Sequence, residues 1–449
     1  MNNSVLVLGM GLSGIQAANL LLKQNESVIL YDGNREKDLS KVRENLSGDV
    51  RFILGELPED VISSVSFAVI SPGISLEVPF ALALKAAGVP IISEIELAWK
   101  YEKGSVIGIT GTNGKTTTTT LVGDIMRAHL GKEKAFTAGN IGIPYANEVL
   151  KSSDDSVTTI ELSSFQLETI DTFHPHISAI LNITPDHLNR HHTMEEYARV
   201  KELITLNQTE EDAVILNYED ERLKAFGEAL KGPKVVWFSG LRTLKNGYFL
   251  RDNVLFKALD GIEEPLLKTE EVLLVGQCNY ENILAAIAVC HEAGVPMDTI
   301  LETVRAFHAV PHRIEFVREV DGVRYYNDSK GTNPDAAIQG IRAMTAKTIL
   351  IGGGYDKGSE YDEWIREFGS KVKELVLLGQ TAEKIAACAK KYGFDNIIFA
   401  DSLEEAVEIC HRDALPGEEV LLSPACASWG MFENYEQRGD IFKDLVRKL

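Results

Sequence analysis

The chain is organised around Ser105-Val-Ile-Gly-Ile-Thr-Gly-Thr-Asn-Gly-Lys-Thr-Thr-Thr-Thr-Thr120. The β-branched start of this stretch predicts a buried strand over 105–110, followed by a tight glycine loop and a helix that begins at Lys115. Glycines let the loop N–H groups point inward and the helix N-terminus adds positive potential, so the segment can cradle phosphates. Lys115 can then reach the β- and γ-phosphates, and the Thr116 hydroxyl can bind Mg²⁺. The Gly-x-x-Gly-Lys-Thr spacing is two residues shorter than the common pattern, and a plain glycine turn is the alternative interpretation.

Length and composition indicate a folded, acidic protein of several domains. At 449 residues, a prior of ~150 residues per domain predicts about three domains, each large enough for its own core. Hydrophobic residues make up 45% and aromatic residues 8%, so disorder is not expected. The formal net charge of −21 argues against a nucleic-acid or membrane-surface partner. Anionic substrates must therefore be held by local positive groups.

The sequence shows no targeting or membrane-spanning pattern. Asn2-Asn3-Ser4 leads directly into a short strand pattern, and no apolar run reaches the ~18 residues that span a bilayer. We therefore expect a cytoplasmic protein that acts on small molecules, and we expect a monomer. The cysteines contain no C-x-x-C pair, which favours reduced core thiols over a zinc site; they are Cys278, Cys290, Cys388, Cys410 and Cys426.

The N-terminal segment resembles a dinucleotide-binding unit. A strand over 4–9 opens into Gly9-Met-Gly-Leu-Ser13-Gly14 and an apolar helix, and a second strand ends at Asp32. Alone, this pattern could bind NAD, bind another nucleotide, or only pack a helix tightly on a strand. The stronger nucleotide motif at 111–116 weighs against NAD. A third strand ends in the turn Ser71-Pro-Gly73, so these strand ends are expected to form one pocket.

Three further loops follow strands near the phosphate motif. Gly139-Asn140-Ile-Gly142 follows a short strand, and Glu161 ends the strand 158–161, where such proteins usually keep a carboxylate for Mg²⁺. A strand over 178–182 leads into a polar loop that contains Asp186 and His187. The pattern then predicts a helix over 195–207, a small antiparallel layer over 235–274, and helices over 283–293 and 297–307.

The last third of the chain alternates strands with loops and helices. Strands are expected over 323–327, 348–351, 374–378, 396–400 and 419–422. This alternation predicts a second doubly wound parallel sheet, with ligands bound at the carboxyl ends of its strands. The polar loops at these ends are Asp328-Ser-Lys-Gly-Thr-Asn333, Gly352 to Gly358 and Ser423-Pro-Ala-Cys-Ala-Ser428.

Eight motifs in this order resemble those of the Mur ligase family, and the resemblance covers essentially the whole chain. They are Gly111–Thr116, Gly139–Gly142, Glu161–Leu167, Asp186-His187, Pro311–Glu315, Asp328–Asn333, Gly352–Gly358 and Ser423–Ser428. The resemblance implies an α/β protein of three domains: a Rossmann-like uridine-nucleotide domain over 1–95, a P-loop ATP-binding domain with a parallel sheet over 96–308, and a doubly wound Rossmann-like amino-acid domain over 309–449.

The implied activity is ATP-dependent amide formation in peptidoglycan precursor synthesis. The Gly9–Gly14 unit and the Glu161–Leu167 run are most similar to the family member that adds D-glutamate to UDP-N-acetylmuramoyl-L-alanine through an acyl phosphate. Such a transfer between anions depends above all on charge neutralisation. ATP and Mg²⁺ are the implied cofactors, and the partners are small-molecule substrates only.

The resemblance also implies a role for individual residues. Lys115 would hold the phosphates with Gly111, Thr112, Asn113, Gly114, Thr116 and Thr117; Thr116 and Glu161 would bind one Mg²⁺, and His187 with Lys201 a second. Asn279 and Asn282 would face the adenine, Asp328 the ribose and Arg313 the terminal phosphate. Asn140 would contact the muramoyl peptide, and the uridine nucleotide would meet Ser13, Asp32, Ser71 and Gly73. The D-glutamate carboxylates would meet Lys330, Thr332, Lys357, Ser428 and the chain around Tyr435; Lys330 would join Lys115, His187 and Lys201 in the catalytic set.

Helix periodicity alone would make Lys201 an ordinary solvated residue, whereas the resemblance places it beside a divalent cation. A lysine ammonium there would be repelled by several kcal/mol even at an effective dielectric near 20. The hypothesis is that Lys201 reacts with CO₂ to form a carbamate, an anionic oxygen ligand suited to a hard cation.

Three competing functions remain open. Another amide ligase of the same superfamily, such as a different Mur ligase or a folylpolyglutamate synthase, would share the P-loop and the C-terminal domain. An NAD-dependent dehydrogenase would use Gly9–Gly14 but would leave Lys115 without a role. A regulatory P-loop protein would not need two further substrate-sized domains.

Overall fold

The computed structural model describes residues 4–308 and 310–449 and shows an α/β fold with three mostly parallel sheets, as predicted. The chain divides into two compact units, the first made of residues up to 266 with 282–304 and the second of 267–281 with 305–449. The first unit contains the five-stranded sheet and the body of the nine-stranded sheet, and the second contains the six-stranded sheet. The expected boundary residue 309 lies outside the described residues, and the division into three domains stays a prediction.

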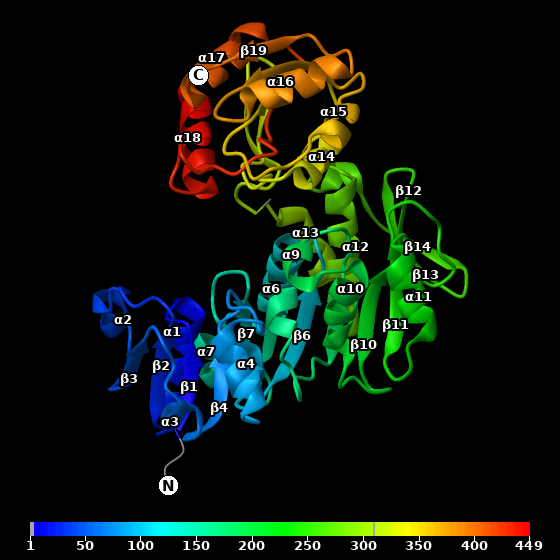
Figure 1. The fold of residues 1–449 in the computed structure, drawn as a ribbon. Coiled ribbons are helices and arrows are strands. Elements are labelled where there is room, and N and C mark those ends of the chain that lie inside the picture. The colour runs from blue at the N-terminus through cyan, green and yellow to red at the C-terminus, as the bar shows by residue number, and fades with distance from the viewer. Residues whose placement is uncertain (1–3, 309) are drawn as a thin grey trace. The chain divides into compact units, whose positions relative to one another are not determined.

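The N-terminal sheet is parallel with the order β3-β2-β1-β4-β5 (Figure 1). Its strands are β1 (Ser4–Leu8), β2 (Val28–Asp32), β3 (Arg51–Leu54), β4 (Val65–Ile70) and β5 (Ile91–Ser93), with helices α1 (Leu12–Lys23), α2 (Ser40–Glu44), α3 (Glu59–Ile62), α4 (Pro79–Ala86) and α5 (Glu94–Trp99). A Cβ on Gly14 would lie 2.0 Å from the carbonyl oxygen of Gly9. Only glycine therefore lets α1 pack this closely, as the Gly-x-Gly-x-x-Gly pattern requires.

The central sheet has the order β14-β13-β12-β11-β10-β9-β6-β8-β7. Its parallel part consists of β6 (Ser105–Thr110), β7 (Ala135–Gly139), β8 (Val157–Glu161), β9 (Ile177–Ile180), β10 (Ala213–Asn217) and β11 (Lys234–Ser239). The helices of this region are α6 (Lys115–Leu130), α7 (Tyr145–Glu148), α8 (Ser164–Leu167), α9 (Leu188–His191), α10 (Met194–Glu202), α11 (Glu221–Ala229), α12 (Gln277–Glu292) and α13 (Met297–Ala306), with 3₁₀ turns at Val149–Lys151, Leu203–Thr205 and Thr269–Glu271. The predicted buried strand at 105–110 and the helix that begins at Lys115 are confirmed.

The expected antiparallel layer is present, but it continues the central sheet instead of covering it. Strand β12 (Gly247–Arg251) pairs parallel with β11 and antiparallel with β13 (Val254–Leu259), and β14 (Ile262–Lys268) forms the edge. Pro265 lies within β14, where a residue without an N–H is tolerated because an edge strand pairs on one side only.

The C-terminal sheet has the order β15-β16-β20-β17-β18-β19 and is parallel apart from the β15–β16 pair. Its strands are β15 (Glu315–Val320), β16 (Val323–Asn327), β17 (Thr348–Gly352), β18 (Val372–Leu377), β19 (Ile397–Phe399) and β20 (Glu419–Leu422), with helices α14 (Pro334–Ala343), α15 (Asp362–Arg366), α16 (Ala382–Lys391), α17 (Leu403–Asp413) and α18 (Tyr435–Lys448). All five predicted strands are present; β15 is an additional strand at the edge.

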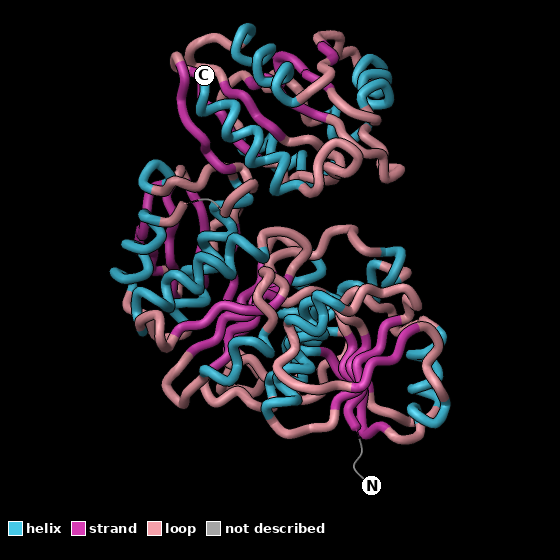
Figure 2. Tube along the Cα trace, turned by 90° about the vertical axis from the view of Figure 1, so that its left-hand side faces the viewer, coloured by secondary structure: helices cyan, strands magenta, loops and turns pink. Residues whose placement is uncertain are grey.

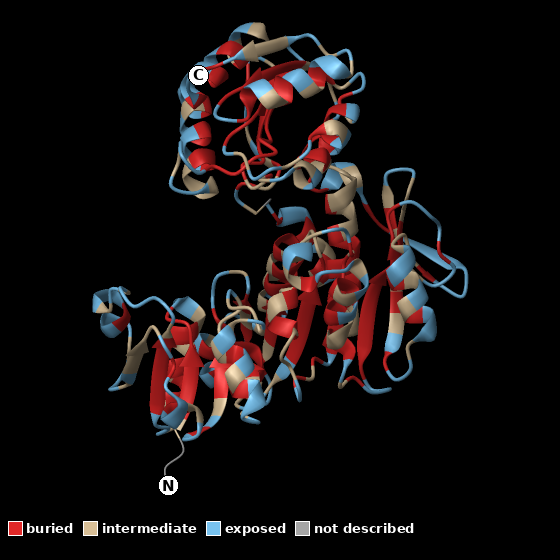
Figure 3. Cartoon of the chain, viewed as in Figure 1, coloured by how far each residue is buried: buried red, intermediate tan, exposed pale blue. Residues whose placement is uncertain are grey.

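Buried apolar strands form the core of each sheet, and helices flank them (Figures 2 and 3). Two strands are buried on both faces, over Val106–Ile109 of β6 and Ile349–Ile351 of β17. Burial on both faces explains why their sequences are continuous apolar runs. All five cysteines are free thiols. Among the described residues, no helix is both long and apolar enough to cross a membrane.

Candidate active site

Three polar loops meet at the carboxyl ends of β2, β1 and β4. Gly9 to Ser13 follows β1, Asp32 ends β2, and Ser71 to Gly73 follows β4, so these predicted residues lie at one edge of the sheet. The Ser71 Oγ is buried and has no hydrogen-bond partner in the described part of the chain. Asp32 accepts from the Asn34 N–H at 3.0 Å and lies 3.5 Å from the Lys37 Nζ. The crevice between β1 and β4 is where sheets of this type bind nucleotides.

The glycine loop between β6 and α6 has the geometry of a phosphate cradle. Gly111 and Gly114 have φ angles of 148° and 84°, and Lys115 begins the helix. The Lys115 Nζ donates to the carbonyl oxygens of Gly111 at 2.9 Å and Thr112 at 2.7 Å. A Cβ on Gly114 would lie 2.2 Å from the Asn282 Oδ1, so a larger residue in this left-handed position would have to displace the Asn282 amide on α12. The loop N–H groups and the helix N-terminus can together bind an anion.

Asn182, two residues after the end of β9, fixes the shape of this loop. Its Oδ1 accepts from the Asn113 N–H at 2.8 Å, its Nδ2 donates to the Asn113 carbonyl at 3.1 Å, and its own carbonyl accepts from the Thr112 N–H at 2.9 Å. The motifs assign Asn182 no role. In the sequence, only its place at the end of a strand expected to lie beside the glycine loop could have indicated that Asn182 belongs to the site.

Glu161 is the last residue of β8, which pairs with β6, as the pattern predicts. Its Oε1 accepts from the Asn140 Nδ2 at 2.7 Å, so the structure brings these two predicted site residues together. Its Oε2 is buried and has no partner among the residues described here. A buried, unpaired carboxylate oxygen is costly unless a cation or donor satisfies it.

The unpaired Glu161 oxygen suits Mg²⁺ better than it suits a metal held by protein side chains alone. Within residues 4–308 and 310–449, no group of three His, Cys, Asp or Glu side chains could hold a metal ion. Mg²⁺ usually takes one or two carboxylates and completes its shell with water and substrate phosphates. The free Glu161 oxygen, near the start of the P-loop helix, fits that pattern.

His187 directly precedes the short helix α9 and has a left-handed backbone, φ 53°. Its Nε2 lies 3.5 Å from the Asp186 carboxylate, and its ring centroid lies 4.8 Å from that of Phe165. Burial and the charges of Lys115, Lys201 and Arg190 hold the His187 pKa below its ordinary value, although Asp186 opposes them. This shift favours the neutral ring, the form that can bind a metal.

Lys201 on α10 is only 1% exposed, so the expectation of a solvated side chain is wrong. Its Nζ donates to the Gly111 carbonyl at 2.8 Å and lies 4.7 Å from the centroid of the Tyr197 ring. Burial and the Lys115 charge hold the Lys201 pKa well below its ordinary value. Tyr197, which the motifs leave unassigned, pairs its hydroxyl with the Thr112 Oγ1 at 3.2 Å. Lys201 and Tyr197 thus both contact the P-loop.

In the second unit, Asp328 follows β16 and is buried. The Ser423 Oγ donates to its Oδ2 at 2.7 Å and the Ile314 N–H to its Oδ1 at 3.3 Å. Burial raises the Asp328 pKa to about 7, although Arg313 and Arg438 oppose the shift. The Arg313 Nε is itself buried without a partner among the described residues.

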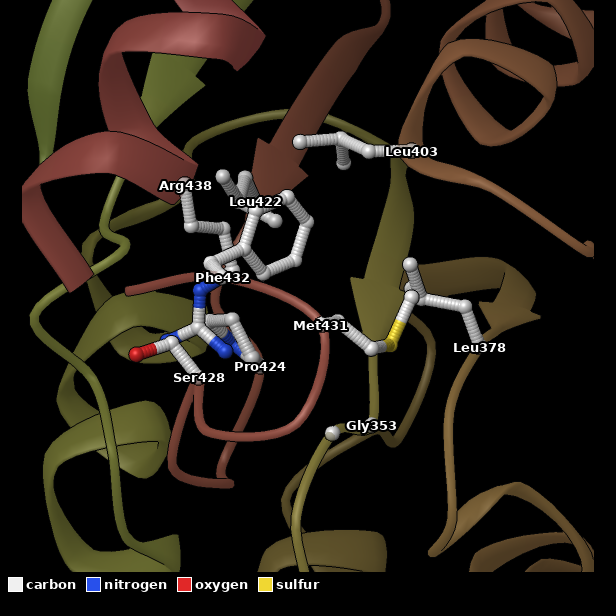
Figure 4. A pocket seen from close by; sticks show the side chains of 10 residues that line it. Gly353, Leu378, Leu403, Leu422, Pro424, Ser428, Met431, Phe432 and Arg438 are labelled. Atoms are coloured by element: carbon white, nitrogen blue, oxygen red, sulfur yellow. The ribbon is translucent and has the colours of Figure 1, made fainter. Parts of the chain in front are cut away.

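The loops after β16, β17 and β20 converge at one end of the C-terminal sheet. A bridge between Tyr355 and Ala427 joins two of them, and Ser428 lines a small pocket with Gly353 and the Arg438 side chain (Figure 4). The predicted cations lie over aromatic rings: the Lys330 Nζ is 5.3 Å from the Tyr435 centroid and the Lys357 Nζ 5.3 Å from that of Trp429. Thr332 follows on the Lys330 loop, with its N–H bonded to the Lys330 carbonyl at 2.8 Å.

Asn279 and Asn282 lie in the first turns of α12, three residues apart and so on one helix face. Both are buried. The Asn279 Nδ2 donates to the Val275 carbonyl at 2.8 Å.

Family models match the chain in three consecutive segments. The Mur ligase MurD-like N-terminal domain matches residues 3–93, the Mur ligase middle domain 109–290, and the Mur ligase glutamate ligase domain 312–426.

Curated relatives match over the full length. The UDP-N-acetylmuramoylalanine–D-glutamate ligase of Lachnospira eligens is 55% identical over 100% of this chain and 99% of its own. The ligase of the same name from Lachnoclostridium phytofermentans is 51% identical over 100% of this chain and 99% of its own. The one from Clostridioides difficile is 46% identical over 99% of this chain and 98% of its own.

Solved structures share the fold at lower identity. The UDP-N-acetylmuramate–alanine ligase of Thermotoga maritima has a TM-score of 0.61 at 19% identity and covers 99% of both chains. The MurF ligase of Thermotoga maritima in complex with ADP has a TM-score of 0.59 at 17% identity and covers 100% of this chain and 96% of that chain. With the three matched domains and relatives this similar over its whole length, the chain belongs to the Mur ligase family of amide-forming enzymes.

Proposed function

We propose that this enzyme uses ATP to join D-glutamate to UDP-N-acetylmuramoyl-L-alanine, a cytoplasmic step of peptidoglycan precursor synthesis, and that it acts as a monomer. The observation that carries the proposal is full-length identity of 45–55% to relatives that bear the name of this ligase. The γ-phosphoryl group of ATP would pass to the carboxylate of the alanyl substrate, with loss of ADP. The D-glutamate amine would then attack the acyl carbon, form the amide and release phosphate and a proton.

The P-loop is the proposed ATP site. The backbone of Gly111 to Gly114, with Thr117 behind it, would surround the phosphates, and Lys115 would exchange its two carbonyl partners for phosphate oxygens. Preorganised donors of this kind stabilise the charge that develops during phosphoryl transfer.

Two Mg²⁺ positions are proposed from the side chains around the P-loop. Thr116 and the unpaired Glu161 Oε2 would hold one ion, while neutral His187 and a modified Lys201 would hold a second. Bound Mg²⁺ would neutralise phosphate and carboxylate charge during the transfer. Asn140 orients Glu161 through its hydrogen bond and is the proposed contact for the muramoyl peptide.

The uridine nucleotide is assigned to the N-terminal crevice. The buried, unpaired Ser71 Oγ and the start of α1 at Gly11 to Ser13 offer polar groups to a phosphate, while Asp32 and Gly73 lie at the neighbouring strand ends. Asp32 can accept from a ribose hydroxyl or the base.

The second unit is the proposed site for D-glutamate. The cations Lys330 and Lys357, with Thr332, Ser428 and the backbone near Tyr435, can bind two carboxylates. Asp328 would bind the ATP ribose, Arg313 the terminal phosphate, and Asn279 with Asn282 the adenine. This division of labour supports the proposed domains 1–95, 96–308 and 309–449, which the three matched segments 3–93, 109–290 and 312–426 resemble in extent.

The test is release of ADP in the presence of UDP-N-acetylmuramoyl-L-alanine and each member of a panel of amino acids. We expect ADP release with D-glutamate and not with L-glutamate, D-aspartate or L-alanine. Equal rates with another amino acid, or reaction with a different muramoyl nucleotide, would point to another ligase of the family.

A further inference from the structure

We propose that Arg190 is the positioning residue that couples the Ser71–Gly73 turn to the loop that carries His187, so that a ligand on one raises the affinity of the other. The inference rests on the proposed function, because it takes the turn as the uridine-nucleotide contact and the His187 loop as part of the Mg²⁺–ATP site.

The Arg190 guanidinium joins segments 118 positions apart in the sequence. Its Nη1 donates to the Pro72 carbonyl, in the middle of the turn, at 2.9 Å. Its Nε and Nη2 donate to the two carboxylate oxygens of Glu168 at 3.1 and 2.5 Å. Both charged side chains are only 12% exposed, so the pair is largely withdrawn from water. A planar fork that holds a carboxylate and a carbonyl at once is a geometry that arginine provides and lysine does not.

The same guanidinium also contacts the His187 side of the site. Its Cζ lies 4.2 Å from the centroid of the Phe165 ring, and that ring lies 4.8 Å from the His187 ring. Glu168 provides a second connection between Arg190 and the His187 loop, because its Oε1 lies 3.5 Å from the Nδ1 of His191, the last residue of α9. The Pro72 carbonyl is therefore connected to the imidazole of His187 through a continuous chain of packed groups.

The loop itself depends on contacts from outside. His187 and His192, at the two ends of α9, both have positive φ angles, 53° and 65°, which cost free energy in residues other than glycine. His192 also bonds through its Nε2 to the Glu77 Oε1 at 2.9 Å, a second contact to the chain that follows the turn. A nucleotide that fixes the turn would fix both contacts, and the loop would then lose less conformational entropy when Mg²⁺–ATP binds.

The coupling can be measured directly by titration calorimetry on the full chain. The probes are UDP and Mg²⁺ with the non-hydrolysable analogue AMP-PNP. In the wild type we expect saturating UDP to raise the Mg²⁺–AMP-PNP affinity at least about fivefold, with the same factor in the reverse titration, as linkage requires. In Arg190→Lys and Arg190→Gln the factor should fall to about one, whatever happens to the affinity of either ligand alone.

Arg199→Gln is the matched control, because Arg199 is exposed on the neighbouring helix and, among the described side chains, forms hydrogen bonds only with Glu196. It should keep the wild-type factor. Glu168→Gln, which weakens the same fork, should lower it. Full coupling in both Arg190 variants, or two ligands that bind the wild type independently, would overturn the inference. A wild type that binds neither UDP nor Mg²⁺–AMP-PNP would overturn the proposed function, and this inference with it.

Discussion

At the scale of single residues, Lys115 carries the clearest prediction. Its ammonium group bonds to two carbonyl oxygens of its own loop, positions that phosphate oxygens can replace. Lys115→Ala should cost roughly 3 to 4 kcal/mol of transition-state stabilisation, so that turnover falls a hundredfold or more while the fold stays intact. The exposed Lys151→Ala serves as the control. A Lys115→Ala enzyme that kept more than about a tenth of the wild-type rate would contradict the P-loop assignment.

Lys201 carries the second prediction. Burial keeps its amine neutral more readily than in water, and a neutral amine can attack CO₂, form an N–C bond and release a proton. We expect a carbamate signal from Lys201 by ¹³C NMR of enzyme equilibrated with ¹³C-bicarbonate. Lys201→Ala should lose activity, Lys201→Glu should retain more of it, and removal of CO₂ should slow the wild type reversibly. An enzyme indifferent to bicarbonate and without the signal would refute the carbamate.

At the scale of elements, the sequence pattern predicts those strands and helices that residues close together in the chain determine. The apolar run of β6 and the helix that begins at Lys115 follow from strand periodicity and glycine spacing. Lys201 could not be predicted as buried, because the group that accepts its hydrogen bond, the Gly111 carbonyl, lies 90 residues away in the sequence. Strand β15 escapes prediction because it is an exposed antiparallel edge strand whose residues alternate with little apolar burial.

The contact between α5 and α7 gives an element-scale prediction. Glu94, the first residue of α5, is buried, and its Oε1 accepts from the Ala146 N–H at 2.5 Å while its Oε2 has no partner among the described residues. Burial raises the Glu94 pKa from 4.5 to about 7. Between these values the unfolded chain has lost the proton that the folded chain still holds, so stability falls as pH rises.

Glu94→Gln should therefore flatten the decline in melting temperature between pH 5 and pH 8, since the shift corresponds to at most about 3 kcal/mol. Differential scanning calorimetry at both pH values is the measurement, with the exposed Glu133→Gln as control. If the melting temperature of Glu94→Gln declined with pH as steeply as that of the wild type, ionisation of the Glu94 carboxyl would not destabilise the fold.

At the scale of the whole molecule, three sheets present polar loops at the carboxyl ends of their parallel strands, and each loop set has its own chemistry. The N-terminal sheet offers Ser71 and Asp32, the central sheet the P-loop and Glu161, and the C-terminal sheet two lysines above aromatic rings. In a protein of net charge −21, these local cations and N–H groups are what make binding of anionic substrates feasible. The strand pattern of the sequence predicts each loop set. It does not predict a contact such as that of Arg190 with Pro72, because the two residues lie far apart in the chain.

Because each sheet has its own set of polar loops, we can predict which of them determines the amino-acid specificity. Lys357 follows β17 and Ser428 follows β20, two adjacent strands of one sheet, so the two side chains can hold the two carboxylates of one small diacid. Lys357→Ala and Ser428→Ala should each raise the KM for D-glutamate tenfold or more, because a lost charged hydrogen bond is worth about 1.5–3 kcal/mol, while the KM for ATP changes less than about threefold. Lys390→Ala, an exposed position on α16, is the control and should change neither constant. If both constants rose equally in the Lys357 and Ser428 variants, the amino acid and ATP would share these contacts, and the assignment of D-glutamate to the C-terminal sheet would be wrong.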